Sequence, residues 1–174
     1  MQSAMGKVWR GARGVLALVG LGSLLAACDP VNISELEEGV STEADVRERF
    51  GAPENVWEGE DGAQIYEYNR QPEGNVNYMI TIGPDGKMAS LRQVLNPRTF
   101  AQVKSGMPME QVRRMLGKPM KITNFALKGE THYDWRYQEQ PGVGETKVFT
   151  AVFDRELKVV STMSGPDRER DHSR

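Results

Sequence analysis

The sequence predicts an α+β fold of two tandem modules, each with two short helices followed by a three- to four-stranded antiparallel sheet. Two observations predict it. The pattern Val-Arg-x-x-(Phe/Leu)-Gly-x-Pro occurs at residues 46–53 and again at residues 112–119. Each copy is followed by segments in which apolar and polar residues alternate between turn residues, which is typical of antiparallel strands. A repeated helix end with repeated strands after it indicates one unit that occurs twice.

Each copy of the pattern has the features of the end of a short helix. An apolar pair four residues apart shares one helix face, a glycine supplies a left-handed cap, and a proline two residues later prevents continuation. A further glycine precedes each of these helices. The positions are Gly39, Val46, Phe50, Gly51 and Pro53 in the first module and Gly106, Val112, Leu116, Gly117 and Pro119 in the second.

The first 27 residues have the composition of a signal peptide. Lys7, Arg10 and Arg13 form a basic region, and residues 15–25 form an apolar run that ends in small residues. The apolar run is too short to cross a bilayer core of roughly 30 Å comfortably. We therefore predict that residues 1–27 are removed.

The predicted cleavage site is specific to one class of exported protein. Leu25-Ala26-Ala27-Cys28 resembles the lipobox of bacterial lipoproteins, and Cys28 is the only cysteine of the chain. This resemblance implies that Cys28 carries acyl chains such as palmitate, and several such chains form a durable membrane anchor. Asp29 resembles the signal that retains lipoproteins in the inner membrane of enteric bacteria. Residues 28–32 are then an acylated tether.

The first module is expected over residues 33–95. A turn or short helix begins near Ile33 and ends at Gly39, and a helix begins after Thr42, which forms a weak capping box with Asp45. Alternating apolar and polar residues then predict strands, with an Asp-Gly hairpin signal before the last one. The expected strands lie around residues 56–57, 64–68, 78–82 and 88–95.

The second module is expected over residues 96–163. Asn96 caps a helix that Pro97 opens and Gly106 ends, and Pro108 opens the next helix. The same alternation predicts its sheet, with strands around residues 120–122, 131–137, 147–153 and 157–162. The remaining residues, 164–174, are charged and lack apolar side chains, so a disordered tail is expected there.

The arrangement of the sheets has two alternatives. The strands form either one sheet per module or one continuous sheet across both. The first module's aromatic pair, Tyr66 and Tyr68, aligns with one of two pairs in the second, Tyr133 with Trp135 or Trp135 with Tyr137. These aromatic side chains either line a protein-binding face or pack under the helices, and burial is favoured because a small module needs its large side chains for its core.

Composition and motifs argue against several functional classes. A net charge of −2 gives no electrostatic footprint for nucleic acid, and one cysteine with two histidines leaves little for a metal site. His132 lacks a nucleophile partner, and the acidic segment 58–62 is better explained as a hairpin tip than as a calcium loop. Arg47, Arg113 and Arg114 are assigned to solvated helix faces. We expect no catalytic residue, cofactor or metal.

A lipobox, the repeated helix end and aromatic antiparallel strands together resemble the BamE/SmpA/OmlA family, once in each module. That family consists of small lipoproteins of the Gram-negative outer membrane, accessory subunits of the machinery that folds and inserts β-barrel proteins. Its members usually carry one module, whereas this chain carries two. The tandem is also similar to β-lactamase inhibitor proteins, which grip an enzyme with a concave sheet rich in aromatic residues.

The residues and the resemblance together predict a non-enzymatic, periplasm-facing lipoprotein. Its expected location is the outer membrane, with the inner membrane as the alternative because of Asp29. Its expected partners are the membrane, through Cys28, and an envelope protein complex such as the β-barrel assembly machinery. The alternative function is a periplasmic module that binds and inhibits an enzyme.

Overall fold

The structure, a computed structural model that describes residues 33–140 and 142–168, contains two four-stranded antiparallel sheets. The first half comprises α1 (Glu43–Phe50), β1 (Asn55–Glu58), the 3-10 helix η2 (Glu60–Gly62), β2 (Gln64–Asn69), β3 (Asn77–Ile82) and β4 (Met88–Gln93). The second half comprises α2 (Pro97–Phe100), α3 (Met109–Leu116), β5 (Lys121–Phe125), β6 (Glu130–Tyr137), β7 (Lys147–Phe153) and β8 (Val159–Pro166). The predicted α+β architecture with one sheet per half is confirmed, and the sheets do not join into one.

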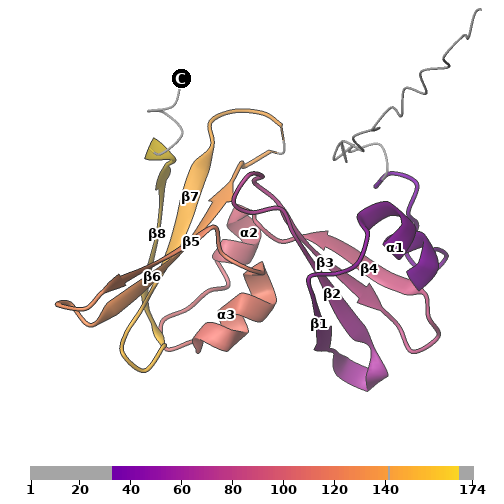
Figure 1. Cartoon of the computed structure of the whole chain (residues 1–174), viewed down its shortest axis with the longest axis horizontal. Coiled ribbons are helices and arrows are strands. Elements are labelled where there is room, and N and C mark those ends of the chain that lie inside the picture. The colour runs from indigo at the N-terminus through magenta and orange to yellow at the C-terminus, as the bar shows by residue number, and fades with distance from the viewer. Residues whose placement is uncertain (1–32, 141, 169–174) are drawn as a thin grey trace, which may run out of the picture.

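Helices and sheets alternate as layers. Figure 1 shows α1 on one side of the first sheet, α2 and α3 between the two sheets, and the second sheet beyond them. The first core packs Val46 of α1 against the tyrosines of β2 and apolar residues of β3 and β4. The second core packs Val112 and Leu116 of α3 against Trp135 and its neighbours, and it also includes Met79 of the first sheet. Helix α3 is therefore covered on two sides.

Several helix caps and helix ends predicted from the sequence are found in the structure. Thr42 and Asp45 form the predicted capping box, since the Thr42 side chain accepts from the Asp45 N–H and the Asp45 carboxylate accepts from the Thr42 N–H. Asn96 caps α2 by accepting from the Thr99 N–H. The glycines Gly51 and Gly117 end α1 and α3.

Of the two structures predicted between Ile33 and Gly39, a turn or a short helix, the structure has turns and no helix. The backbone of this segment pairs with the sheet instead. The Gly39 N–H donates to the Met88 carbonyl oxygen at 2.8 Å, and the Met88 N–H donates to the Ser41 carbonyl oxygen at 2.8 Å. Gly39 thus marks the point where the chain meets β4, and the first module has one α-helix before its sheet.

Gly106 was likewise assigned incorrectly to a helix end. Helix α2 stops at Phe100, and the Gly106 N–H donates to the Val159 carbonyl oxygen at 2.7 Å. This is the same contact that Gly39 makes with Met88. Both glycines have a positive φ, 80° for Gly39 and 82° for Gly106.

The predicted disordered tail, which begins at residue 164, overlaps the end of β8. Strand β8 continues to Pro166, and the Asp167 N–H donates to the Thr146 carbonyl oxygen at 3.0 Å. Residues 164–166 extend the edge strand β8 by pairing with β7. Main-chain hydrogen bonds hold this pairing, so a lack of apolar side chains does not prevent it. Residues 169–174 lie outside the described part of the chain.

The same hydrogen bonds recur in the two halves and determine the register. The Tyr68 hydroxyl donates to the Gly51 carbonyl oxygen at 3.1 Å, and the Trp135 indole N–H donates to the Gly117 carbonyl oxygen at 2.9 Å. Tyr66 and Tyr68 therefore correspond to Tyr133 and Trp135, the first of the two predicted alignments. In each half a strand residue ties the end of the helix to the sheet.

Candidate functional site

The predicted lipid attachment site, Cys28, lies outside the described residues, as does Asp29. Within residues 33–140 and 142–168, no helix is long and apolar enough to span a bilayer. All of the described residues follow the predicted tether, residues 28–32, in the chain.

The two motif glycines adopt a conformation that differs from the predicted left-handed helical cap. Gly51 has φ 80° and ψ −161°, and Gly117 has φ 76° and ψ −171°. These angles fall in a region that is essentially restricted to glycine, so a side chain at either position would strain the backbone. Each helix end turns the chain directly toward the following strand, with Pro53 and Pro119 just after the turn.

The segment after α3, residues 116–119, docks onto the first sheet, and we call it the α3 corner. The Lys118 N–H donates to the Glu67 carboxylate at 2.6 Å. The Asn77 side-chain amide donates to the carbonyl oxygens of Leu116, at 2.8 Å, and Lys118, at 3.1 Å. Side chains of the first sheet thus satisfy backbone groups that the end of a helix leaves without partners. The corresponding corner after α1 is exposed at Gly51.

Glu67 is the centre of this contact. Its side chain is 1% exposed. The carboxylate also accepts from the Trp57 indole N–H at 3.2 Å and pairs with Arg113 at 3.4 Å. Arg114 lies over the Trp57 ring, with its guanidinium carbon 5.0 Å from the ring centroid. Arg113 and Arg114, predicted on solvated faces, therefore contribute to the contact between the halves.

A second contact joins the halves near the ends of β6 and β8. Gln71 makes two hydrogen bonds to the backbone of Arg136, donating to its carbonyl oxygen at 2.8 Å and accepting from its N–H at 3.2 Å. The buried Arg136 guanidinium forms an ion pair with buried Asp167 and donates to the Pro72 carbonyl oxygen. Because every polar group here has a partner, the halves are held in one arrangement.

These contact residues were missed by sequence reasoning for a physical reason. Arg136 alternates with Tyr133, Trp135 and Tyr137, and Glu67 stands between Tyr66 and Tyr68. Alternation places each of the two only on the strand face opposite the aromatic residues. Their partners are distant in sequence, and periodicity describes only one element at a time.

The aromatic side chains pack under the helices. Tyr66, Tyr68, Tyr133, Trp135 and Tyr137 are buried. The prediction that favoured core packing is confirmed for these five residues. These five side chains therefore do not line an exposed protein-binding face of a sheet.

The two buried tyrosines of the first core, Tyr66 and Tyr68, have raised pKa values. Burial raises the pKa of Tyr68 to about 12. Burial also raises the pKa of Tyr66, whose hydroxyl donates to the Glu43 carboxylate at 2.7 Å. That hydrogen bond, with one from Arg47, lowers the pKa of Glu43. The tyrosines therefore remain protonated within the ordinary pH range and serve as hydrogen-bond donors.

His132 does not assemble a catalytic group. Its Nε2 lies 3.1 Å from the Glu130 carboxylate, and its ring lies 4.4 Å from the Phe125 ring. The described residues include no cysteine, and no group of three metal-binding side chains occurs among them. The environment is that of a half-buried strand residue.

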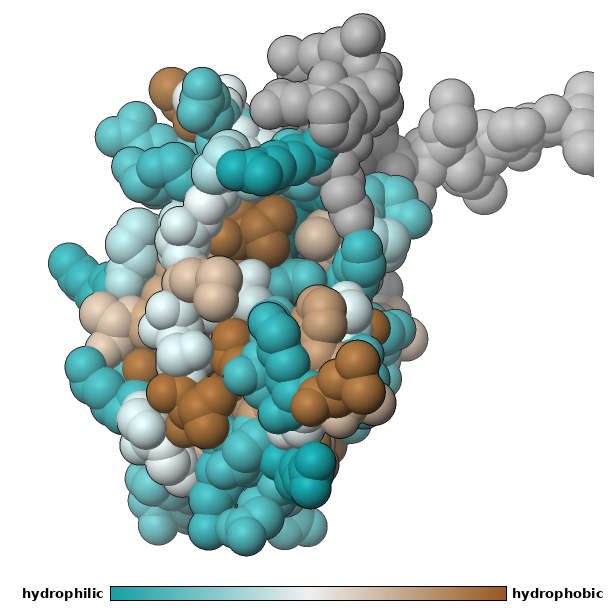
Figure 2. Space-filling view, turned by 90° about the vertical axis from the view of Figure 1, so that its left-hand side faces the viewer, coloured by the Kyte–Doolittle hydropathy of each residue, from teal (hydrophilic) through white to brown (hydrophobic). Residues whose placement is uncertain are grey.

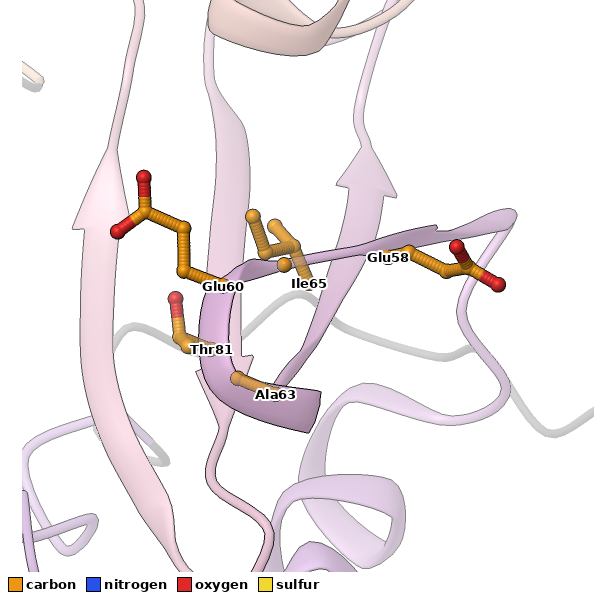
Figure 3. Close-up of a pocket in the computed structure, with 6 residues that line it drawn as sticks. Glu58, Glu60, Ala63, Ile65 and Thr81 are labelled. Atoms are coloured by element: carbon orange, nitrogen blue, oxygen red, sulfur yellow. The ribbon is translucent and has the colours of Figure 1, made fainter.

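The acidic segment forms a hairpin tip, as predicted, with η2 between β1 and β2. A hollow of about 510 Å³ beside it is lined by Glu58, Glu60, Ala63, Ile65 and Thr81, together with Gly59. Figure 3 shows that the carboxylates of Glu58 and Glu60 point in different directions and do not converge on one point. Their arrangement does not resemble a calcium loop.

With this geometry described, comparison with known proteins identifies part of the chain. Residues 93–163 match the family model described as the outer membrane protein assembly factor BamE domain. We call residues 93–163, after the family model that they match, the BamE domain. It coincides closely with the predicted second module, so the resemblance stated for that module is confirmed.

The other comparisons add little. No curated protein matches the chain. Among solved structures, a DUF4309 family protein (YjgB) from Bacillus subtilis subsp. subtilis str. 168 is 17% identical, and the alignment covers 76% of this chain and 83% of that chain with a TM-score of 0.28. A TM-score this low does not define a shared fold.

The BamE domain has one open sheet face, on the side away from α2 and α3. Figure 2 views the molecule from this side and shows hydrophobic side chains scattered among polar ones. Phe125, 39% exposed, and Met163, 53% exposed, belong to this face because they lie opposite Glu130 and Thr150 and not opposite the core aromatics. The helix side of the BamE domain faces the first sheet, so the opposite sheet face is the one left open to a partner.

Proposed function

We propose that the chain is a non-catalytic envelope lipoprotein that acts as an accessory scaffold in outer-membrane protein assembly. The BamE domain at residues 93–163 is the observation that carries this proposal. The surroundings of the side chains agree with it, because the buried charged groups described above serve contacts between elements. In this proposal the chain works by holding partners and not by chemistry.

Cys28 is the proposed membrane attachment point. The lipobox-like sequence before it and the short apolar run of the leader support acylation. An anchored chain is confined to a membrane surface, which raises its effective concentration at membrane partners without adding any contact. The outer membrane is the proposed location, and separation of the two membranes by density tests the contribution of Asp29.

The first half is proposed to be a second BamE-like module. The Gly39 contact with Met88 and the Gly106 contact with Val159 support this, as do the matching glycine angles at Gly51 and Gly117. A tandem explains why the first sheet can cover α3. Helix α1, at the end of the stack, carries charged side chains on its free side, as the terminal unit of a repeat requires.

Affinity isolation from solubilised envelopes tests the proposed function. A tagged chain is expected to co-isolate the subunits of the β-barrel assembly machinery, and the Cys28→Ala variant is expected to recover much less of them. Incorporation of labelled palmitate, present in the parent and absent in the variant, confirms the anchor independently. Recovery of a soluble hydrolase in place of assembly subunits would favour the inhibitor function.

A further inference from the structure

The two modules have hairpins of different composition between their first two strands. In the first module this hairpin is acidic, with Glu58, Glu60 and Asp61. In the second module the equivalent hairpin, between β5 and β6, has the apolar tip Phe125-Ala126-Leu127 followed by Lys128. The equivalent hairpin is thus acidic in the first module, and apolar with an adjacent lysine in the second.

The β5–β6 tip exposes apolar surface, although the Phe125 ring also packs against His132, with the ring centroids 4.4 Å apart. The Leu127 side chain is fully exposed, at 103%, and Phe125 is 39% exposed. The turn is closed by a hydrogen bond from the Lys128 N–H to the Phe125 carbonyl oxygen at 2.9 Å. Turn tips are ordinarily built from small or polar residues, so Leu127 beside the partly exposed Phe125 leaves apolar surface available to a partner.

Two cationic side chains lie near this apolar tip, whereas the nearby Glu130 carboxylate lies 3.1 Å from His132 Nε2. The Lys128 ammonium lies 5.8 Å from the centroid of the Phe125 ring. The side chain of Arg155, on the neighbouring hairpin, lies beside Gly129. A partner for the tip therefore needs an apolar surface with carboxylates at its margin.

The hollow beside the acidic hairpin has this chemistry. Ala63 and Ile65 supply apolar surface, and Glu58 and Glu60 stand on either side (Figure 3). Among the described residues, neither of these two carboxylates has a hydrogen-bond or ion-pair partner. A volume of about 510 Å³ lies within the roughly 300–1,000 Å³ typical of binding pockets.

We infer that the β5–β6 tip of one copy of this chain binds the acidic hollow of a second copy, with Leu127 on the apolar surface and Lys128 beside the glutamates. The two hairpins project from opposite sides of the molecule, so the tip does not reach its own hollow (Figure 1). The contact joins different surfaces of the two copies. It therefore extends into an open head-to-tail row and does not close as a dimer.

The contact is small, so self-association is weak in solution and stronger for copies held on one membrane. Specific stable interfaces bury roughly 1,200–2,000 Å², more than a hairpin tip can provide. Confinement to a surface raises the local concentration and compensates for low intrinsic affinity. Because the contact pairs opposite charges on exposed groups, it weakens as ionic strength increases.

Sedimentation of the chain from residue 28 onward, with Cys28→Ala to exclude acylation, tests the inference. The average mass is expected to rise beyond that of a dimer with protein concentration and to fall with added salt. Leu127→Asp is expected to raise the dissociation constant about tenfold, and so is the double variant Glu58→Lys, Glu60→Lys. Val143→Asp, a matched substitution in another exposed loop, should leave association unchanged.

Mixing the two defective variants gives the decisive result. Each lacks one surface and keeps the other, so the mixture should form a one-to-one dimer that does not grow further. The Leu127 side chain contacts nothing, so unfolding in urea should be unchanged in that variant and a folding defect is excluded. A parent chain that stays monomeric, or binding of Leu127 to vesicles containing anionic lipid in the absence of self-association, overturns the inference.

Discussion

At the scale of single residues, Glu67 joins the two halves through its contacts with Lys118 and Arg113. It is a buried carboxylate that accepts from a backbone N–H and an indole N–H and faces Arg113. Glu67→Ala leaves these donors and the partly buried Arg113 guanidinium without their partner, so we expect a loss of about 3 kcal/mol in the free energy of unfolding. Urea denaturation measures this loss.

Glu54 supplies the matched control for Glu67. It pairs with the Lys118 ammonium at 2.6 Å, but both side chains are exposed. Glu54→Ala should therefore cost less than about 1 kcal/mol. Equal losses for the two variants would show that the buried contact does not hold the halves together.

Tyr68 gives a prediction about alkaline pH. Because its pKa is raised by burial to about 12, the folded state retains the proton after the unfolded state has lost it. Stability from this group is complete below pH 10, the ordinary tyrosine pKa, and is lost as the pH rises from 10 toward 12. Unfolding free energies measured across this range should fall.

Tyr68→Phe tests the assignment of that pH dependence. The variant loses the hydrogen bond to the Gly51 carbonyl oxygen and should be less stable by about 1 kcal/mol at neutral pH. Its stability should then fall less steeply above pH 10 than that of the parent. An unchanged slope would assign the alkaline loss to other groups.

At the scale of elements, the ends of α1 and α3 allow a direct comparison. Both Gly51 and Gly117 have glycine-restricted angles, so alanine at either costs about 1–3 kcal/mol in backbone strain. A Cβ at Gly117 would also lie 2.9 Å from the Asn77 amide nitrogen, whereas one at Gly51 meets nothing within 4 Å. We expect Gly117→Ala to be clearly more destabilising in thermal unfolding.

The same elements show how far the sequence predicts this fold. Helix caps, helix stops and alternating strands are local signals, and they placed α1, α3 and both sheets. Gly39 and Gly106 were misassigned because a glycine before a turn resembles a helix end, although here it marks pairing with β4 or β8. The contacts of Glu67 and Arg136 join residues far apart in the chain, and no local pattern encodes them.

At the scale of the whole molecule, the two contacts between the halves should make unfolding cooperative. Helix α3 lies between both sheets, and Arg136 and Asp167 fasten the end of β8 to the first half. We expect one calorimetric transition for the parent. Asp167→Ala removes the carboxylate that pairs with the buried Arg136 charge and should lower the free energy of unfolding by about 3–5 kcal/mol. Two separate transitions in the parent would contradict the description of the halves as one unit.

The proposal that this chain is an assembly scaffold is tested most directly by site-specific photo-crosslinking in living cells. A crosslinking residue at Met163, on the open face of the BamE domain, is compared with one at Glu48, which is exposed on α1. The account predicts crosslinks from position 163 to a subunit of the β-barrel assembly machinery and few from position 48. Acylated chain that forms no such crosslink from position 163, or forms it equally from both positions, would contradict the account.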